Sequence, residues 1–181
     1  MKDFTNLTYL QSGNPKQKTV YQLIQELKIC NILSDFNPLI VGTIPIDIDL
    51  PDSDVDIICE VSSLQKFKLL LTNKFRSFHS FTCKEKIIRN ENSCICRFIY
   101  KNFTFEIFGQ NVPTEQQYAY RHMMIEYQIL QFLPTSFQEQ IILLKKQGLK
   151  TEEAFAKRLN LSGDPFEALL NFDIKSIIYN E

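Results

Sequence analysis

The chain lacks the features that would place a 181-residue sequence in a special class of protein. No run approaches the roughly 20 apolar residues that a membrane-spanning helix needs, and the first residues have no apolar stretch of the signal-peptide kind. Neither sign of charge dominates, since 20 Lys and Arg stand against 21 Asp and Glu. We therefore expect no membrane partner and no surface built mainly for long duplex nucleic acid, so any anion site must be local.

Paired cysteine spacing, internal repeats and low-complexity tracts are also missing. The five cysteines are odd in number, have no CxxC spacing and lie in apolar runs, so we expect free, buried thiols in a reducing cytoplasm. They are Cys30, Cys59, Cys83, Cys94 and Cys96. Tryptophan is absent, and the 15 Phe and 7 Tyr are interpreted as core residues rather than as a base-stacking platform.

The remaining composition is that of an ordinary globular protein, with 44% apolar and 23% charged residues. The periodicity predicts a helix, two strands, a helix, three strands and then several helices. Predicted strands are 39–42, 55–60, 78–84, 94–100 and 103–108, with a hairpin turn at Lys101 and Asn102. Predicted helices are 15–32, capped by Asn14, one from residue 62 or 63, 114–132, opened by a capping box from Thr114 to Gln117, and others from residues 135, 151 and 165.

This order of elements predicts an α+β fold, in which a mixed sheet is packed with helices and followed by a helical C-terminal segment. We expect residues 1–110 to form the α/β core and residues 111–181 to pack on it as helices, within one compact domain.

One segment is strongly acidic: residues 45–60 contain six acids and neither Lys nor Arg. Neighbouring carboxylates resist ionisation unless cations or hydrogen-bond donors compensate them. Asp54 and Asp56 enter a predicted strand two residues apart, so both side chains leave the same face. Glu106 alternates with apolar residues in a later strand. If the two strands are neighbours, three carboxylates converge in a way that suits Mg²⁺ and phosphoryl chemistry.

These residues also resemble a known family. A strand ending in Gly42 and Thr43, the sequence Ser53-Asp54-Val55-Asp56 twelve residues after the glycine, and a later strand acid at Glu106 are similar to the nucleotidyltransferase superfamily of DNA polymerase beta. The resemblance is closest to a branch that carries only a domain-of-unknown-function label. It is sharp over about 20 residues and extends loosely, through the order of elements, to about 110.

The resemblance implies a role for each matching residue. Gly42, Thr43 and Ser53 would belong to the binding site for a nucleoside triphosphate, with the first two holding its β- and γ-phosphates. Asp54 and Asp56 would bind two Mg²⁺ or Mn²⁺ ions. Glu106 would join one metal and help to deprotonate the attacking hydroxyl group.

The chain departs from the family where many relatives have a Gly-rich loop with an Arg. Ile44, Pro45, Ile46 and Asp47 stand there instead, and the Asp would place negative charge where a triphosphate lies. A phosphate clamp would then come from elsewhere in the chain. The candidates are Arg97, Arg121 and Lys145, of which Arg121 is counted with the binding residues because a guanidinium can hold phosphate with two bonds.

Plainer interpretations stay open. Asp54 and Asp56 could be turn formers or part of a calcium loop, and Glu106 could be a solvent-facing residue paired with a lysine. Asp47 and Asp49 suggest an exposed strand edge, because they alternate with apolar residues.

The helix beyond residue 114 carries a further candidate. His122 and Glu126 share a face of that helix, which fits a structural boundary or a contact with substrate.

Two functions follow. The first is a cytoplasmic, Mg²⁺-dependent nucleotidyltransferase that moves a nucleoside monophosphate from an NTP to a hydroxyl group of a small molecule, protein or RNA. The alternative keeps the fold but makes the protein a non-catalytic binding or partner module, because of the acidified loop at Asp47.

Overall fold

The computed structural model describes residues 2–178, so residue 1 and residues 179–181 of the predicted core and helical segment lie outside it. Its centre is a five-stranded mixed sheet with the strand order β1-β2-β5-β4-β3. β2 and β5 run parallel, and the other neighbouring pairs are antiparallel. The strands are β1 (Leu39–Val41), β2 (Val55–Glu60), β3 (His79–Ile88), β4 (Glu91–Tyr100) and β5 (Phe103–Gln110). The predicted α+β fold and all five predicted strands are thus confirmed.

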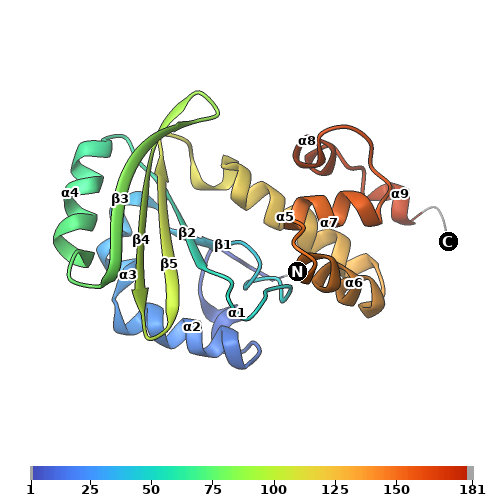
Figure 1. Cartoon of the computed structure of the whole chain (residues 1–181), viewed down its shortest axis with the longest axis horizontal. Coiled ribbons are helices and arrows are strands. Elements are labelled where there is room, and N and C mark those ends of the chain that lie inside the picture. The colour runs from blue at the N-terminus through green and yellow to red at the C-terminus, as the bar shows by residue number, and fades with distance from the viewer. Residues whose placement is uncertain (1, 179–181) are drawn as a thin grey trace.

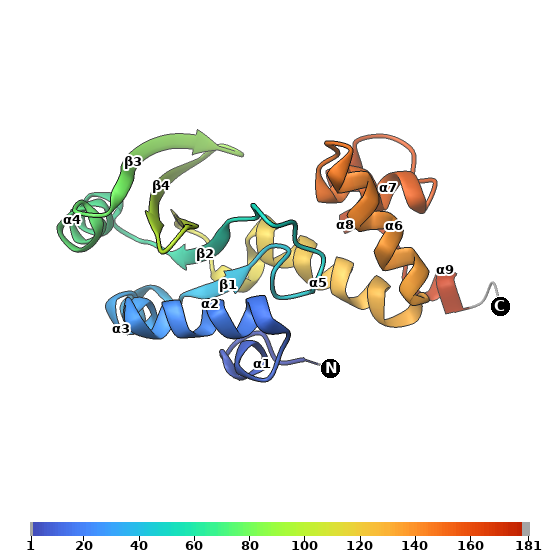
Figure 2. The same cartoon turned by 60° about the horizontal axis from the view of Figure 1, so that its bottom comes forward.

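The helices form two groups (Figure 1). The first lies around the sheet and comprises α1 (Thr8–Gln11), α2 (Pro15–Glu26), α3 (Ile29–Ile32) and α4 (Leu64–Phe75). The second lies on the side of the sheet away from β3, as both views show (Figure 2). It comprises α5 (Tyr118–Phe132), α6 (Thr135–Lys146), α7 (Thr151–Arg158), α8 (Pro165–Leu170) and α9 (Lys175–Ile178). Whether the chain divides at residue 110 into a core and an appended segment stays a prediction.

Alternation along the strands builds the core. Phe105 and Ile107 of β5 are fully buried, and Glu106 between them lies on the opposite face. Three phenylalanines stack under α4, with ring centroids 4.8 Å apart for Phe75 and Phe98 and 5.3 Å apart for Phe98 and Phe105. These phenylalanines are core residues, as predicted, and they anchor α4 to the sheet.

Two-residue turns close both hairpins of the sheet. Lys101 and Asn102 have φ values of 47° and 66°, so the turn predicted between β4 and β5 has the positive φ of the favoured hairpin type. Arg89 and Asn90, with φ values of 53° and 65°, form a second such turn between β3 and β4. This second turn was not predicted from the sequence. It lets β3 continue to Ile88, four residues beyond the predicted end of the strand.

Two helix predictions are wrong in detail. The first helix ends at Glu26, and Lys28 in the left-handed region (φ 53°) separates it from α3, so the predicted 15–32 helix is broken. Thr114 opens a short 3-10 helix, η2 (Thr114–Gln116), and α5 begins at Tyr118 without a side-chain cap. A second 3-10 helix is η1 (Ser34–Phe36). The cap at Asn14 is confirmed, because its side chain accepts from the Gln17 N–H.

No helix within residues 2–178 is long and apolar enough to cross a bilayer.

Two leucines of α4 test how it packs on the sheet. Leu71 is completely buried, whereas Leu69 is 63% exposed. Leu71→Ala is expected to lower the free energy of unfolding by about 2–5 kcal/mol, since it leaves a cavity under the helix. The control Leu69→Ala is expected to lower it by less than about 1 kcal/mol. Urea unfolding measures both, and equal losses would contradict this packing of α4.

Candidate functional site

Three carboxylates and one guanidinium lie in a row on one face of the sheet. The parallel register of β2 and β5 places Asp56 opposite Glu106, and the antiparallel register of β4 and β5 places Arg97 on the other side of Glu106. Asp54 precedes Asp56 by two residues and therefore projects from the same face. The two strands are neighbours, as the convergence of the three carboxylates required.

Arg97 is the cation that faces this row. Its Nε donates to Oε2 of Glu106, and its Nη2 lies 3.7 Å from Oδ2 of Asp54. The Arg97 side chain is 54% exposed, while that of Glu106 is only 22% exposed. Glu106 is thus partly exposed and ion-paired, as the plainer alternative has it, but its partner is an arginine on the same sheet face and not a lysine.

Asp56 lacks a comparable partner. Within residues 2–178 its side chain makes no hydrogen bond or salt bridge. Burial first, and then the charges of Glu106 and Asp54, raise the pKa of Asp56 to about 7, although the charges of Arg97 and Lys145 act in the opposite direction. An enclosed carboxylate with this environment is stabilised in its ionised form by an added cation.

Gly42 lies directly beside Asp56. Its φ of 82° is in the left-handed region, and a Cβ at this position would lie 2.5 Å from Oδ2 of Asp56. Only glycine fits both constraints. Thr43 follows, and its Oγ1 is 3.5 Å from Oγ of Ser53, which accepts from the Leu50 N–H. Ser53 therefore fixes the far end of the loop next to Thr43.

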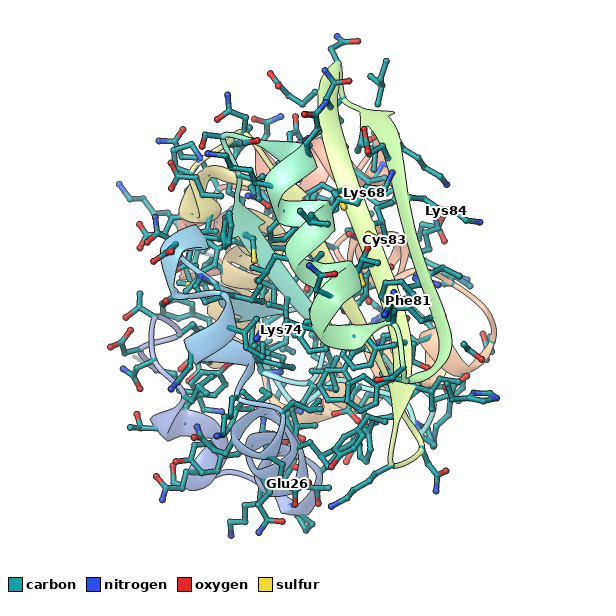
Figure 3. All side chains as sticks on the ribbon, turned by 90° about the vertical axis from the view of Figure 1, so that its left-hand side faces the viewer. Glu26, Lys68, Lys74, Phe81, Cys83 and Lys84 are labelled. Atoms are coloured by element: carbon teal, nitrogen blue, oxygen red, sulfur yellow. The ribbon has the colours of Figure 1, made fainter. Side chains whose placement is uncertain are left out.

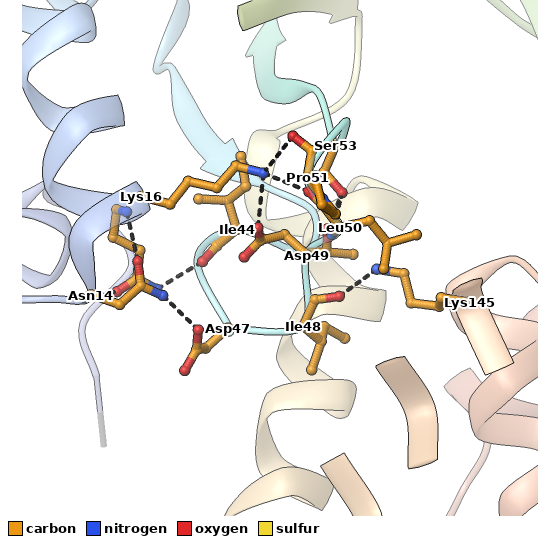
Figure 4. A network of polar contacts seen from close by, with 12 residues as sticks. Asn14, Lys16, Ile44, Asp47, Ile48, Asp49, Leu50, Pro51, Ser53 and Lys145 are labelled. Carbon is orange, nitrogen blue, oxygen red and sulfur yellow. Dashed lines mark hydrogen bonds and ion pairs between the residues drawn. The ribbon is translucent and has the colours of Figure 1, made fainter. Parts of the chain in front are cut away.

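The acidic loop between β1 and β2 is braced from two helices (Figure 4). From α2, Lys16 forms an ion pair of 2.9 Å with Asp49 and also donates to the carbonyl of Leu50, while Asn14 at the helix N-terminus donates to Asp47. From α6, Lys145 donates to the carbonyl of Ile48 at 2.6 Å. The loop is therefore held in one conformation despite its many acids.

The structure corrects three expectations about this loop. Asp47 has a φ of 63° in a turn, and Asp49 is 12% exposed and paired with Lys16, so the two acids do not form an exposed strand edge. Neither residue lines the cleft described next, so the negative charge of Asp47 is not added to it. The loop leads into strand β2 rather than lying between two helices, so the calcium-loop alternative is wrong as well.

A cleft of about 400 Å³ lies between this face of the sheet, α5 and the start of α7. Gly42, Thr43, Asp56 and Glu106 line one wall. The volume is in the range of small-molecule sites. Asp56 and Glu106 therefore face a space of small-molecule size, whereas Ser53 and Asp54 do not line it.

The opposite wall contains buried polar groups. His122 lines the cleft, and its Nε2 lies 3.0 Å from the carbonyl oxygen of Phe166. Glu126 also lines it, and burial raises its pKa well above the ordinary value. The helix face that His122 and Glu126 share therefore lines the cleft, and the contact of His122 with Phe166 gives the same face a structural role.

The candidate phosphate clamps are placed differently. Arg121 is exposed on another surface of α5 and does not line the cleft. Lys145 is buried and bonded to the acidic loop, and burial lowers its pKa. Arg89, which sequence reasoning missed, does line the cleft and stacks 3.5 Å above the centre of the Tyr118 ring. The sequence signal that could have pointed to Arg89 is its place in the hairpin turn between β3 and β4, which was not predicted.

The donor set fits a hard divalent cation in its chemistry. Carboxylate oxygens are the ligands that Mg²⁺ prefers, and Asp56 is free to bind. Within residues 2–178, no group of three acidic, histidine or cysteine side chains is arranged around a metal position. Arg97, which is half exposed, would have to leave Asp54 and Glu106 for these carboxylates to bind an ion.

Asp56 gives a pH test of this site. The folded state binds the Asp56 proton more tightly than the unfolded state, so stability falls as pH rises from about 4 to 7. Asp56→Asn removes the enclosed charge and is expected to raise the free energy of unfolding at pH 8 by about 2–4 kcal/mol, with little change at pH 4. Urea unfolding across this range measures it. The control is Asp52→Asn, because Asp52 is an exposed residue of the same loop. An equal gain in the free energy of unfolding for this control would contradict the proposed effect of Asp56.

Comparisons with known proteins place the chain in a family. Residues 22–172 match a family described as a domain of unknown function, DUF4269. Among curated proteins, no match is found.

Several solved structures share the fold. One is the Cid1 poly(U) polymerase with MgGTP bound, with 15% identity over 84% of this chain and 47% of that chain and a TM-score of 0.53. The polymerase core of TRAMP, an RNA surveillance complex, has 15% identity over 90% of this chain and 50% of that chain, with a TM-score of 0.53. A cytoplasmic RNA terminal U-transferase has 13% identity over 89% of this chain and 50% of that chain, with a TM-score of 0.52. This chain spans about half the length of these structures, and identities this low establish the fold alone. The chain belongs to the family DUF4269 and has the nucleotidyltransferase fold.

Proposed function

We propose that this chain is a divalent-metal-dependent nucleotidyltransferase that moves a nucleoside monophosphate from an NTP to a hydroxyl group of an acceptor. The observation that carries the proposal is the enclosed, unpartnered carboxylate of Asp56, which lies beside Gly42 and faces the cleft. A structural carboxylate would have hydrogen-bond donors around it, whereas a ligand for a cation needs free oxygen atoms.

Asp54, Asp56 and Glu106 would hold Mg²⁺ or Mn²⁺. When bound, such ions neutralise the triphosphate and lower the pKa of the attacking hydroxyl group. The pairing of β2 with β5 sets Asp56 beside Glu106, and Asp54 lies at the entrance to β2, so the chain supplies three oxygen donors near one another.

The other residues divide the remaining work. The backbone of Gly42 and Thr43 and the Thr43 hydroxyl hold the β- and γ-phosphates, and Ser53 keeps Thr43 in place. Glu106 accepts the proton of the acceptor hydroxyl. The acceptor oxygen then bonds to the α-phosphorus, while the bond from that phosphorus to the bridging oxygen breaks and pyrophosphate leaves. Arg97, once released from the carboxylates, is free to bind a phosphate oxygen.

The acceptor is a hydroxyl-bearing small molecule, protein or RNA end. Support for RNA comes from the similar structures, whose names refer to RNA surveillance and to an RNA terminal U-transferase. The formal charge of -1 disfavours a long duplex as the ligand. Five cysteines without a disulfide fit a reducing compartment, and we place the reaction in the cytoplasm.

One observation favours a second candidate function, a non-catalytic binding module of the same fold. Arg97 contacts two of the three carboxylates, so part of their repulsion is offset without a metal. In that case the cleft would bind a ligand or partner without transferring a phosphoryl group.

Calorimetry separates these functions from an inert fold. We expect the wild-type chain with Mg²⁺ or Mn²⁺ to give binding heat with at least one of ATP, GTP, CTP and UTP. In the double variant Asp54→Asn with Asp56→Asn, the affinity for that NTP should fall at least about tenfold, because the metal ligands are lost. Asp52→Asn should bind as the wild type does.

Pyrophosphate release then distinguishes catalysis from binding. Release that requires both an NTP and a candidate RNA acceptor, and that disappears in the double variant, is the expected result. Binding without release from any NTP and acceptor would favour the non-catalytic module. Heat that is unchanged by the double substitution would contradict the proposed site.

A further inference from the structure

A cluster of three thiols lies on the sheet face opposite the carboxylates, under α4. Cys83 of β3 pairs directly with Cys96 of β4, and Cys94 lies two residues earlier on β4, so all three side chains share this face. The Sγ atoms of Cys83 and Cys94 are 3.5 Å apart. The other two cysteines, Cys30 and Cys59, are outside this thiol cluster.

The thiol cluster has one accessible member and two buried ones. Cys94 and Cys96 are completely buried, while Cys83 is partly exposed on the edge strand of the sheet. Figure 3 shows Cys83 between α4 and β3, with Lys68 of α4 beside it. A reagent in solution can therefore reach Cys83 but not its two neighbours.

The surroundings of Cys83 favour its thiolate. Hydrogen bonds with Cys94 and Cys96 lower the pKa of Cys83, and the positive charge of Lys68 acts in the same direction, against the effect of burial. The pKa values of Cys94 and Cys96 are raised, first by their hydrogen bonds with Cys83 and then by burial. Glu85 pairs with Lys68 at 2.8 Å, and its negative charge acts on the thiol cluster in the direction opposite to that of Lys68.

The thiol cluster is not arranged for a metal ion. Across the part of the chain that the structure describes, no three cysteine, histidine or acidic side chains surround a common position that could hold one. An accessible thiolate in contact with a buried thiol has the arrangement of a site for reversible oxidation instead.

We propose that Cys83 is a peroxide-reactive thiol and that Cys94 is its resolving partner. The Cys83 sulfur attacks one oxygen of hydrogen peroxide, the O–O bond breaks, and the products are a sulfenic acid and water. The Cys94 sulfur then attacks the Cys83 sulfur, a disulfide forms, and the sulfenic oxygen leaves as a second water with the Cys94 proton. Peroxide is reduced by two electrons, which the two thiols supply.

Thiol labelling tests this proposal without any nucleotide or metal. At about pH 6.5, iodoacetamide should alkylate Cys83 at least about tenfold faster than Cys30, a partly exposed thiol outside the thiol cluster, since the thiolate is the nucleophile. Lys68→Gln should slow the alkylation of Cys83 severalfold. Lys74→Gln, a second exposed lysine of the same helix, should leave it unchanged.

Peptide mapping after peroxide treatment tests the partner. The expected product is a disulfide between Cys83 and Cys94; in Cys94→Ser, a sulfenic acid on Cys83 should persist and react with dimedone. Equal alkylation rates for Cys83 and Cys30 would overturn the proposal, as would the absence of any oxidised Cys83. A disulfide between Cys83 and Cys96 would overturn the assignment of Cys94. Because Lys68 is exposed, the labelling comparison stands even if a cysteine variant fails to fold.

Discussion

Repulsion between carboxylates that the sheet forces together is the constraint on which this site depends. The parallel pairing of β2 with β5 places Asp56 next to Glu106, and Asp54 projects from the same face. Two like charges about 5 Å apart repel by on the order of 3 kcal/mol at an effective dielectric constant of 20. The protein offsets part of this with Arg97 and leaves Asp56 without a partner. The proposed divalent cation would supply the charge that Asp56 lacks, and Arg97, whose side chain is 54% exposed, has room to move away from it.

Local signals in the sequence predicted most of the sheet and the motif. The alternation around Glu106, the glycine after β1 and the Asp54–Asp56 spacing each follow from short-range chemistry, and the strands carrying them were found where expected. The pairing of Glu106 with Arg97 could also have been predicted. The two-residue turn at Lys101 and Asn102 fixes the register of β4 and β5, and counting back from that turn sets the two residues opposite each other.

Other features depend on contacts that no local pattern encodes. The acids Asp47 and Asp49 look solvated in the sequence; Asp47 is exposed, although Asn14 donates to it, whereas Asp49 is largely covered and pairs with Lys16 of α2. Lys145 lies almost 100 residues from the loop carbonyl to which it donates, so its commitment to the loop could not be inferred from spacing. The break at Lys28 shows the same limit, since Lys is a good helix former and its left-handed conformation follows from the packing of α2 and α3. The roles of the site residues therefore remain a proposal that rests on geometry.

Anomalous diffraction from crystals of this chain grown with Mn²⁺ tests the central claim most directly. The account predicts a Mn²⁺ peak bound by oxygen atoms of Asp54, Asp56 and Glu106 at about 2.1–2.2 Å, a distance typical of small divalent cations, with the Arg97 guanidinium displaced from Glu106. A peak elsewhere, or crystals in which Arg97 still bridges Asp54 and Glu106 at saturating Mn²⁺, would contradict it.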